Sequence, residues 1–193
     1  MDSLEIEKEL NMDLQELYDY LKKKYGLAKE NYFLDESCKC KSSANSRGYE
    51  GLFLHHDLEW NPADPTAHKL SDSATARLYN YEYQKRENLT YCNLLEHLII
   101  HVKINLLRAE HEDCTKYEKF KDGLFRFLIP EVNSYYYRRV EMHTKKTFYK
   151  QQVWNQIKDN WKDYLKIVEY WIERQYQPET KAELKGHLRR LVY

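Results

Sequence analysis

The chain has 193 residues, of which 31 are Lys or Arg and 31 are Asp or Glu, so its formal net charge is zero. This balance gives no bulk electrostatic reason to expect nucleic-acid or membrane binding, and the scarcity of Gly (5) and Pro (4) among many helix formers argues against an all-β sandwich or barrel. No apolar run is long enough for a bilayer, and the acidic N-terminus lacks a signal-peptide pattern. We therefore expect a cytoplasmic protein with no membrane partner.

The N-terminal part is expected to be helical. Leucines at three- and four-residue steps between Ser3 and Lys24 predict one or two helices, with Gly26 as the stop. Residues 34–48 have almost no apolar spacing and predict a loop. The whole chain then divides into N-terminal helices with this Cys-containing loop (1–48), a central core (49–110) and a helical, basic and aromatic region (111–193).

Two short β-prone runs lie in the central part, at residues 49–56 and 87–92, and are expected to pair as a hairpin. The connection between them is about 30 residues long, contains a short helix near residues 71–79, and is of a length usually found in functional or disordered loops. The central part therefore contributes the only strands that the sequence predicts.

A helix is expected over residues 94–110, because Asn93 and Glu96 form a capping-box pattern ahead of an apolar face. Further helices are predicted at 115–128, ended by Pro130, at 131–142, at 148–175, and after Pro178. The expected fold class is therefore mostly α with a small β-hairpin.

Five polar residues lie on the expected hairpin and the following helix: His55, His56, Asn88, His97 and His101. Residues four apart on a helix share a face, so His97 and His101 can bind one cation. Successive side chains of a strand face opposite sides, so His55 and His56 cannot both do the same job unless the strand ends there. If the hairpin packs on the helix, His55 can complete a three-histidine site, and His56 is left to take a proton from water.

With these residues the chain resembles the HNH, or ββα-metal, nuclease superfamily, and within it the DNase domains of colicins. The match consists of Leu54-His55-His56-Asp57, then Asn88-Leu89, then His97 and His101. Asn88 precedes His97 by nine positions and His101 follows four later, as in the colicin-type motif. The resemblance covers residues 49–107 and implies a ββα-metal core flanked by N-terminal and C-terminal helices.

The resemblance also implies a role for each matched residue. His55, His97 and His101 would ligate a divalent metal ion (Mg²⁺, Mn²⁺, Ni²⁺ or Zn²⁺), His56 would be the general base, and Asn88 would hold the hairpin and orient His56. The implied activity is metal-dependent endonucleolytic hydrolysis of phosphodiester bonds in DNA or RNA.

The alternative is an HNH-like protein without catalysis that binds and inhibits a nucleic-acid-processing complex such as a CRISPR effector. Small lone HNH proteins resemble products of phages and mobile elements, so a role in defence or counter-defence fits either reading. The partner is then nucleic acid, or a protein or nucleoprotein.

The sequence departs from the family in two places. The connection between His56 and Asn88 is longer than in a compact family hairpin, and the paired CxxC zinc knuckle is absent. Cys38, Cys40 and Cys92 are therefore read either as a rearranged structural zinc site or as ordinary free thiols.

The last third of the chain is its basic part, with 13 basic and 8 acidic residues over 131–193. Its candidate nucleic-acid-binding residues, interleaved with tyrosines, are Arg138, Arg139, Lys145, Lys146 and Lys150. They would neutralise phosphates while the aromatic rings stack on bases. The competing reading is a helix whose tyrosines pack inward while its charges face water. Trp154, Trp161 and Trp171 share an apolar helical spacing and are read as core.

Overall fold

The structure is a computed structural model that describes residues 3–61, 69–110, 124–137 and 147–175. Within these ranges it is mostly helical with one two-stranded antiparallel sheet, which confirms the predicted fold class. The main helices are α1 (Ser3–Asn11), α2 (Leu14–Tyr25), α4 (Leu94–Glu110), α6 (Ile129–Tyr137), α7 (Thr147–Ile157) and α8 (Trp161–Gln175). Among the described residues, no helix is long and apolar enough to cross a bilayer.

The N-terminal segment forms two helices, α1 and α2, because Asp13 acts as the N-cap of a new helix between them. Asp13 accepts a hydrogen bond from the backbone N–H of Glu16, and the Glu16 side chain accepts one from the N–H of Asp13. This capping box satisfies N–H groups at the start of α2 that have no partner inside the helix. Gly26, with a φ of 83°, ends α2 as the sequence predicts.

The predicted hairpin is confirmed, with strands shorter than the β-prone runs. Strand β1 (Phe53–His56) pairs antiparallel with β2 (Leu89–Cys92), so that Phe53 lies opposite Cys92 and His56 opposite Leu89. The long connection holds the short helix α3 (Ser73–Ala76) and single 3₁₀ turns η2 (Asp57–Glu59), η3 (Tyr81–Gln84) and η4 (Arg86–Asn88). A further turn, η1 (Gly48–Glu50), precedes β1.

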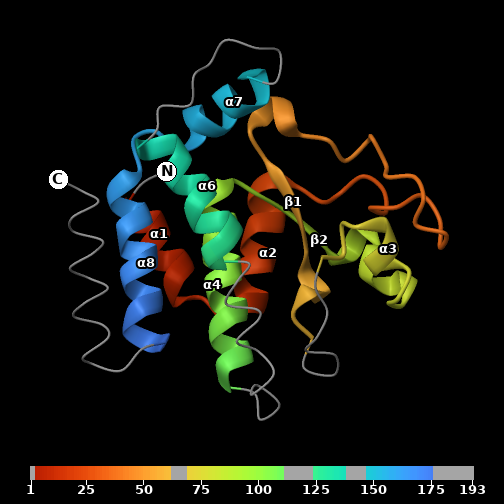
Figure 1. Ribbon diagram of the computed structural model, residues 1–193, viewed down its shortest axis with the longest axis horizontal. Helices are drawn as coiled ribbons and strands as arrows, with labels where there is room; N and C mark the ends of the chain where they lie inside the picture. The colour runs from red at the N-terminus through yellow and green to blue at the C-terminus, as the bar shows by residue number, and fades with distance from the viewer. Residues whose placement is uncertain (1–2, 62–68, 111–123, 138–146, 176–193) are drawn as a thin grey trace.

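Helix α4 is the centre of the molecule, with α1 and α8 on one side and α2 and the hairpin on the other (Figure 1). Its start is fixed by the predicted cap: Asn93 Oδ1 accepts from the N–H groups of Leu95 (2.9 Å) and Glu96 (3.0 Å), and Glu96 Oε2 accepts from the N–H of Asn93 (2.7 Å). Because helices surround it, its apolar side chains form the middle of the main core.

The predicted helix over 148–175 is wrong in one respect, since the chain breaks between α7 and α8. Asn160 explains the break: its backbone carbonyl accepts from the N–H groups of Asp163 and Tyr164, and its side chain donates to Asp163 Oδ2 at 2.8 Å. Asn160 therefore stands directly before α8, and its carbonyl accepts the first hydrogen bonds of the new helix.

Two other C-terminal expectations have clear outcomes. The helix predicted at 131–142 begins two residues earlier, at Ile129, because Pro130 fits the second position of α6, where its missing N–H costs nothing; residues 138–142 lie outside the described ranges. Of the tryptophans read as core, Trp171 is 1% exposed and donates to Asn105 Oδ1 at 2.9 Å, whereas Trp154 and Trp161 are only partly buried. The helix predicted after Pro178 lies outside the described residues.

Candidate metal centre

Three histidines converge where the hairpin meets α4. His55 comes from β1, and His97 and His101 come from successive turns of α4. Each offers one ring nitrogen, and these three atoms lie within 4.8 Å of one another. Nε2 of His97 is 3.1 Å from Nε2 of His101. The structure therefore contains a group of side chains compatible with one divalent metal ion.

The donor set fits such an ion in distance and chemistry. Two nitrogens bound at about 2.0–2.1 Å to a tetrahedral ion lie about 3.3 Å apart, close to the His97–His101 separation. Imidazole nitrogens suit Zn²⁺ and Ni²⁺, whereas Mg²⁺ and Ca²⁺ prefer oxygen ligands. Three protein ligands leave a fourth position, as in zinc sites that act on substrates.

The three imidazoles are held in the neutral form that metal binding requires. Burial lowers the pKa of His97 to about 4. Burial, followed by the nearby His97, also lowers the pKa of His101 well below its usual range. The pKa of His55 is lowered in the same direction, again mainly by burial and then by the other two histidines. No proton therefore has to leave these rings at neutral pH before an ion binds.

Neighbouring side chains fix the orientation of the rings. The Tyr18 hydroxyl on α2 lies 3.3 Å from Nε2 of His55, and Glu59 Oε2 lies 4.0 Å from its Nδ1. The ring of Phe53 stacks on His97 with centroids 5.5 Å apart. Nδ1 of His97 is buried without a hydrogen-bond partner in the described part of the chain, so on that side packing orients the ring.

A positive charge also lies at this centre, on Arg108. It is seven residues after His101 on α4, which places it on the same helical face two turns later. Its guanidinium donates to the backbone carbonyl of Glu59 at 2.7 Å, and its charge helps to lower the pKa values of His55 and His101. Sequence reasoning missed Arg108, although the helical spacing from His101 could have found it.

His56 is not part of the three-histidine group. Its Nε2 lies 3.1 Å from Gln84 Oε1, its ring lies 4.5 Å from that of Tyr32, and it is 3% exposed. Burial lowers its pKa to about 4. The alternation along β1 thus directs His55 to α4 and its neighbour to the connection between the strands. The role of His56 as a general base stays a prediction.

Asn88 is connected to His56 only through intermediate residues. Its Nδ2 donates to the carbonyl of Glu82 at 2.9 Å, which closes the turns η3 and η4 in front of β2. Gln84, the hydrogen-bond partner of His56, lies within this closed segment. The side chain of Asn88 therefore holds the backbone that positions Gln84, and does not contact the imidazole directly.

Replacing Asn88 with Ala should lower the stability of the folded protein without changing its affinity for the metal ion. Loss of the hydrogen bond to Glu82 is expected to lower the free energy of unfolding by about 1 kcal/mol. Urea denaturation measures this loss, and calorimetric titration with Zn²⁺ or Ni²⁺ should give an affinity equal to that of the wild type. A large drop in metal affinity would contradict this purely structural role.

The described cysteines do not form a zinc site. Cys38 packs with Phe33 and Ala76, Cys92 belongs to the main core, and Cys40 is exposed. All three are free thiols, and they do not gather with one another or with other metal-ligating side chains in the ranges described. This favours the reading as ordinary thiols.

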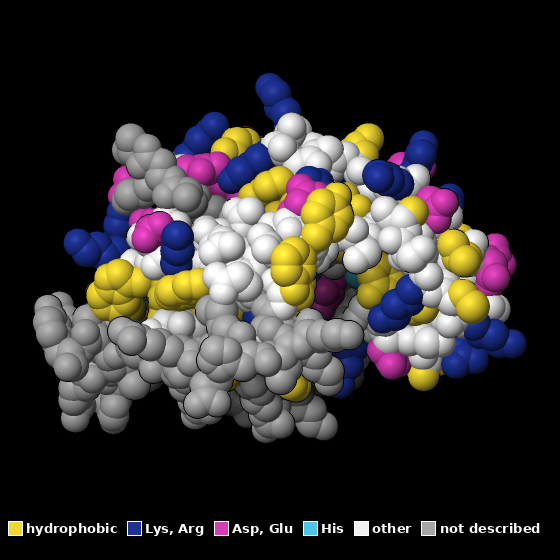
Figure 2. Space-filling model, turned by 90° about the horizontal axis from the view of Figure 1, so that it is seen from above, with side chains coloured by type: hydrophobic (Ala, Val, Ile, Leu, Met, Phe, Trp, Pro, Cys, Tyr) yellow, Lys and Arg dark blue, Asp and Glu magenta, His cyan; other side chains and the backbone are white. Residues whose placement is uncertain are grey.

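Of the five predicted nucleic-acid-binding residues, the structure describes one, Lys150, which is exposed on α7. The other four, Arg138, Arg139, Lys145 and Lys146, lie outside the described residues. On the face shown in Figure 2, basic and acidic side chains are interspersed rather than gathered into one patch.

The tyrosines of the same region favour the packing reading. Tyr135 is 4% exposed, and the Tyr136 hydroxyl donates to the carbonyl of Ile157 at 2.6 Å. The Tyr136 ring also packs against those of Trp154 and Tyr164. Neither tyrosine is therefore free to stack on a base.

Comparison of the chain with protein-family models, with curated proteins and with solved structures gave no match.

Proposed function

We propose that the chain is a metal-dependent phosphodiesterase of the HNH type that cleaves DNA or RNA. One observation carries this proposal: His55 from the first strand of a hairpin and His97 and His101 from the next helix offer nitrogens within 4.8 Å of one another. The order β1, β2 and α4, with a helix that packs on the hairpin, is the order of a ββα-metal core. The motif spacing from Asn88 to His101 supports the same class.

In this proposal, different residues of the chain would bind the ion, orient its ligands and stabilise the charge on the phosphate. His55, His97 and His101 would hold the ion through one ring nitrogen each. The other ring nitrogen of His55 would face either Tyr18, at Nε2, or Glu59, at Nδ1, and that neighbour would keep the ring oriented. A bound divalent ion would supply Lewis-acid stabilisation of the charge that develops on the phosphate and its leaving oxygen. Arg108 would add a fixed positive charge beside the phosphate.

His56 can act as the general base in this proposal only after it leaves Gln84. While His56 is buried, burial lowers its pKa to about 4 and the imidazole is unprotonated at neutral pH. Once it leaves this position, its pKa would return toward the ordinary value, near which a histidine is an effective general base. Its 3% exposure and its contact with Gln84 mean that substrate binding would have to open the connection between the strands. The turn η3, which carries Gln84, is the part that would have to move.

The same burial of His56 favours a second candidate, a protein that keeps the metal centre and has no cleavage activity. In that case the ion stabilises the junction of hairpin and helix, and the surface binds a nucleic-acid-processing complex such as a CRISPR effector. The interspersed charges in Figure 2 suit a protein partner better than a phosphate backbone.

A cleavage assay separates the two candidates. The full chain is incubated with plasmid DNA and with single-stranded RNA in the presence of Mg²⁺, Mn²⁺, Ni²⁺ or Zn²⁺, with and without a chelator. We expect cleavage that the chelator and His97→Ala abolish, and that His56→Ala lowers by about 10²–10⁴-fold if His56 is the base. Metal binding without cleavage under every condition would reject the nuclease and leave the non-catalytic candidate.

A further inference from the structure

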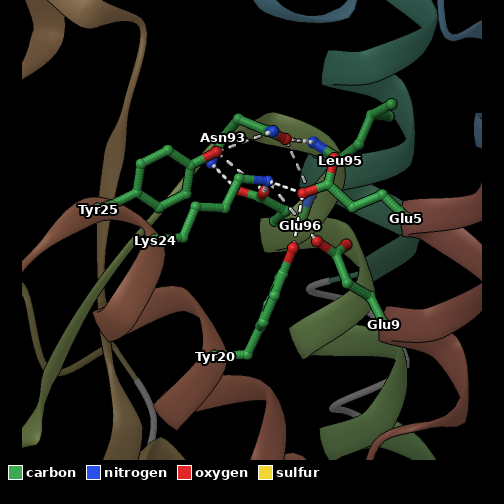
Figure 3. A network of polar contacts seen from close by, with 8 residues as sticks. All are labelled: Glu5, Glu9, Tyr20, Lys24, Tyr25, Asn93, Leu95 and Glu96. Carbon is green, nitrogen blue, oxygen red and sulfur yellow. Dashed lines mark hydrogen bonds and ion pairs between the residues drawn. The ribbon is translucent and has the colours of Figure 1, made fainter. Parts of the chain in front are cut away.

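A group of three acidic side chains lies where α1 packs against the start of α4. Glu5 and Glu9 of α1 and Glu96 of α4 each offer a carboxylate oxygen, and these atoms lie within 4.8 Å of one another. Figure 3 shows the three carboxylates pointing toward one another from two helices. Glu9 and Glu96 are both 0% exposed. Such a concentration of buried negative charge requires compensation.

Lys24 of α2 compensates only part of this charge. Its Nζ donates to Glu5 and to Glu96, the latter at 2.7 Å, but lies 3.9 Å from Glu9. One ammonium thus faces three carboxylates, which leaves a net charge of minus two if all of them are ionised. The Lys24 side chain is 25% exposed, so Lys24 lies between the buried carboxylates and solvent.

Glu9 is the carboxylate that this arrangement leaves unsatisfied. Both of its oxygens are buried without a hydrogen-bond partner in the part of the chain that is described. The neighbouring hydroxyl donors are committed elsewhere: Tyr20 donates to Glu5 at 2.8 Å and Tyr25 to Glu96 at 2.9 Å. An ionised carboxylate left in this state is costly, and burial together with Glu96 raises the pKa of Glu9 to about 8.

We propose that Glu5, Glu9 and Glu96 form a binding site for a hard divalent cation such as Ca²⁺, with Lys24 as an internal competitor for the same position. Three carboxylates provide up to six oxygen ligands, and Ca²⁺ accepts six to eight of them in flexible geometry. With Lys24 displaced, the three carboxylates carry a charge of minus three if all are ionised, and the ion would neutralise two of these charges. Because the Lys24 stem is long and partly exposed, its ammonium can turn into water when the ion enters.

This site would be chemically distinct from the histidine centre, although Glu96 and His97 are adjacent in sequence. Ca²⁺ selects oxygen donors and binds imidazole poorly, whereas Zn²⁺ and Ni²⁺ select the three histidines. The ion would connect α1 to the first turn of α4, where Glu96 already caps the helix. Its binding can therefore be tested separately from that of the ion in the proposed nuclease centre.

Calorimetric titration of the full chain with Ca²⁺ tests the proposal. We expect one Ca²⁺ bound by the wild type and none by Glu9→Gln, which keeps the shape of the side chain and removes its charge. Lys24→Met should tighten Ca²⁺ binding by about tenfold or more, because it removes the competing charge. Glu7→Gln is the matched control: Glu7 lies on the same helix, is 56% exposed, and pairs with Lys166 outside the cluster.

The absence of Ca²⁺ binding up to millimolar concentration in both the wild type and Lys24→Met would overturn the proposal and leave a protonated Glu9 as the explanation of the buried carboxylate. Equal binding by the wild type and Glu9→Gln would also overturn it, because the ion would then lie elsewhere. If Lys24→Met does not fold, thermal denaturation of the other two proteins decides. A Ca²⁺-dependent rise in melting temperature that Glu9→Gln loses supports the site, and an equal rise or no rise in both rejects it.

Discussion

His101→Ala is expected to weaken the binding of Zn²⁺ or Ni²⁺ by about 100-fold or more, because it removes one of only three protein ligands. The effect should extend to stability. An ion that binds only the folded chain raises the free energy of unfolding with the logarithm of the ratio of its free concentration to its Kd. A 100-fold loss of affinity therefore removes about 2.7 kcal/mol of this stabilisation when the ion concentration is far above both Kd values. Competition calorimetry measures the affinity, and urea denaturation with and without the ion measures the stability.

The control for this experiment is His56→Gln, which changes a buried histidine of the same hairpin that lies outside the three-histidine group. It should bind the ion as the wild type does. The apo forms provide a second control, because His101→Ala without metal should lose only the packing of one half-buried ring. If His101→Ala and the wild type bind Zn²⁺ and Ni²⁺ equally well, the ion does not bind at this centre.

The parts of the structure that follow from local geometry were predictable from the sequence. The position of His101 four residues after His97 places both on one face of α4, whatever surrounds the helix. The cap by Asn93 and Glu96 and the stop at Gly26 are likewise properties of a few neighbouring residues. Alternation in β1 separates His55 from His56 in the same way.

The parts that depend on contacts between distant segments were not predictable. Nothing in the sequence near Gln84 indicates that its side chain meets His56, because the long connection has no periodicity. The contact of Tyr18 with His55 depends on how α2 packs against β1. The break before α8 was missed because the apolar spacing continues through Asn160, although its backbone carbonyl accepts the first hydrogen bonds of a new helix.

The carboxylate cluster illustrates the same limit. Glu5 and Glu9 are four residues apart on α1, and this spacing was visible in the sequence, but an acidic pair on a helix is usually solvated surface. Their meeting with Glu96 joins segments about ninety residues apart and depends on the packing of α1 against α4. Only the structure shows that Glu9 is buried there without a hydrogen-bond partner in the described part of the chain.

The wild type should lose stability on acidification relative to His56→Gln, by about 2 kcal/mol between pH 7 and pH 5 and by about 3 kcal/mol at pH 4. The pKa of His56 is lowered in the folded protein from 6.5 to about 4. Between these two values the unfolded chain binds a proton that the folded chain does not, so the stability of the wild type falls as the pH falls through this window. Gln has no such proton, and its amide can still face Gln84.

The comparison uses a difference between two proteins because other buried groups titrate over the same range in the opposite direction. Burial raises the pKa of Glu59 to about 7 and that of Glu9 to about 8, so both carboxyl groups take up protons in the folded state first and add stability as the pH falls. These contributions are common to both proteins and cancel. Urea denaturation of both proteins in the presence of a chelator at pH 7, 6, 5 and 4 gives their free energies of unfolding as a function of pH. Curves that stay parallel across these pH values would show that His56 titrates normally and is not held buried against Gln84.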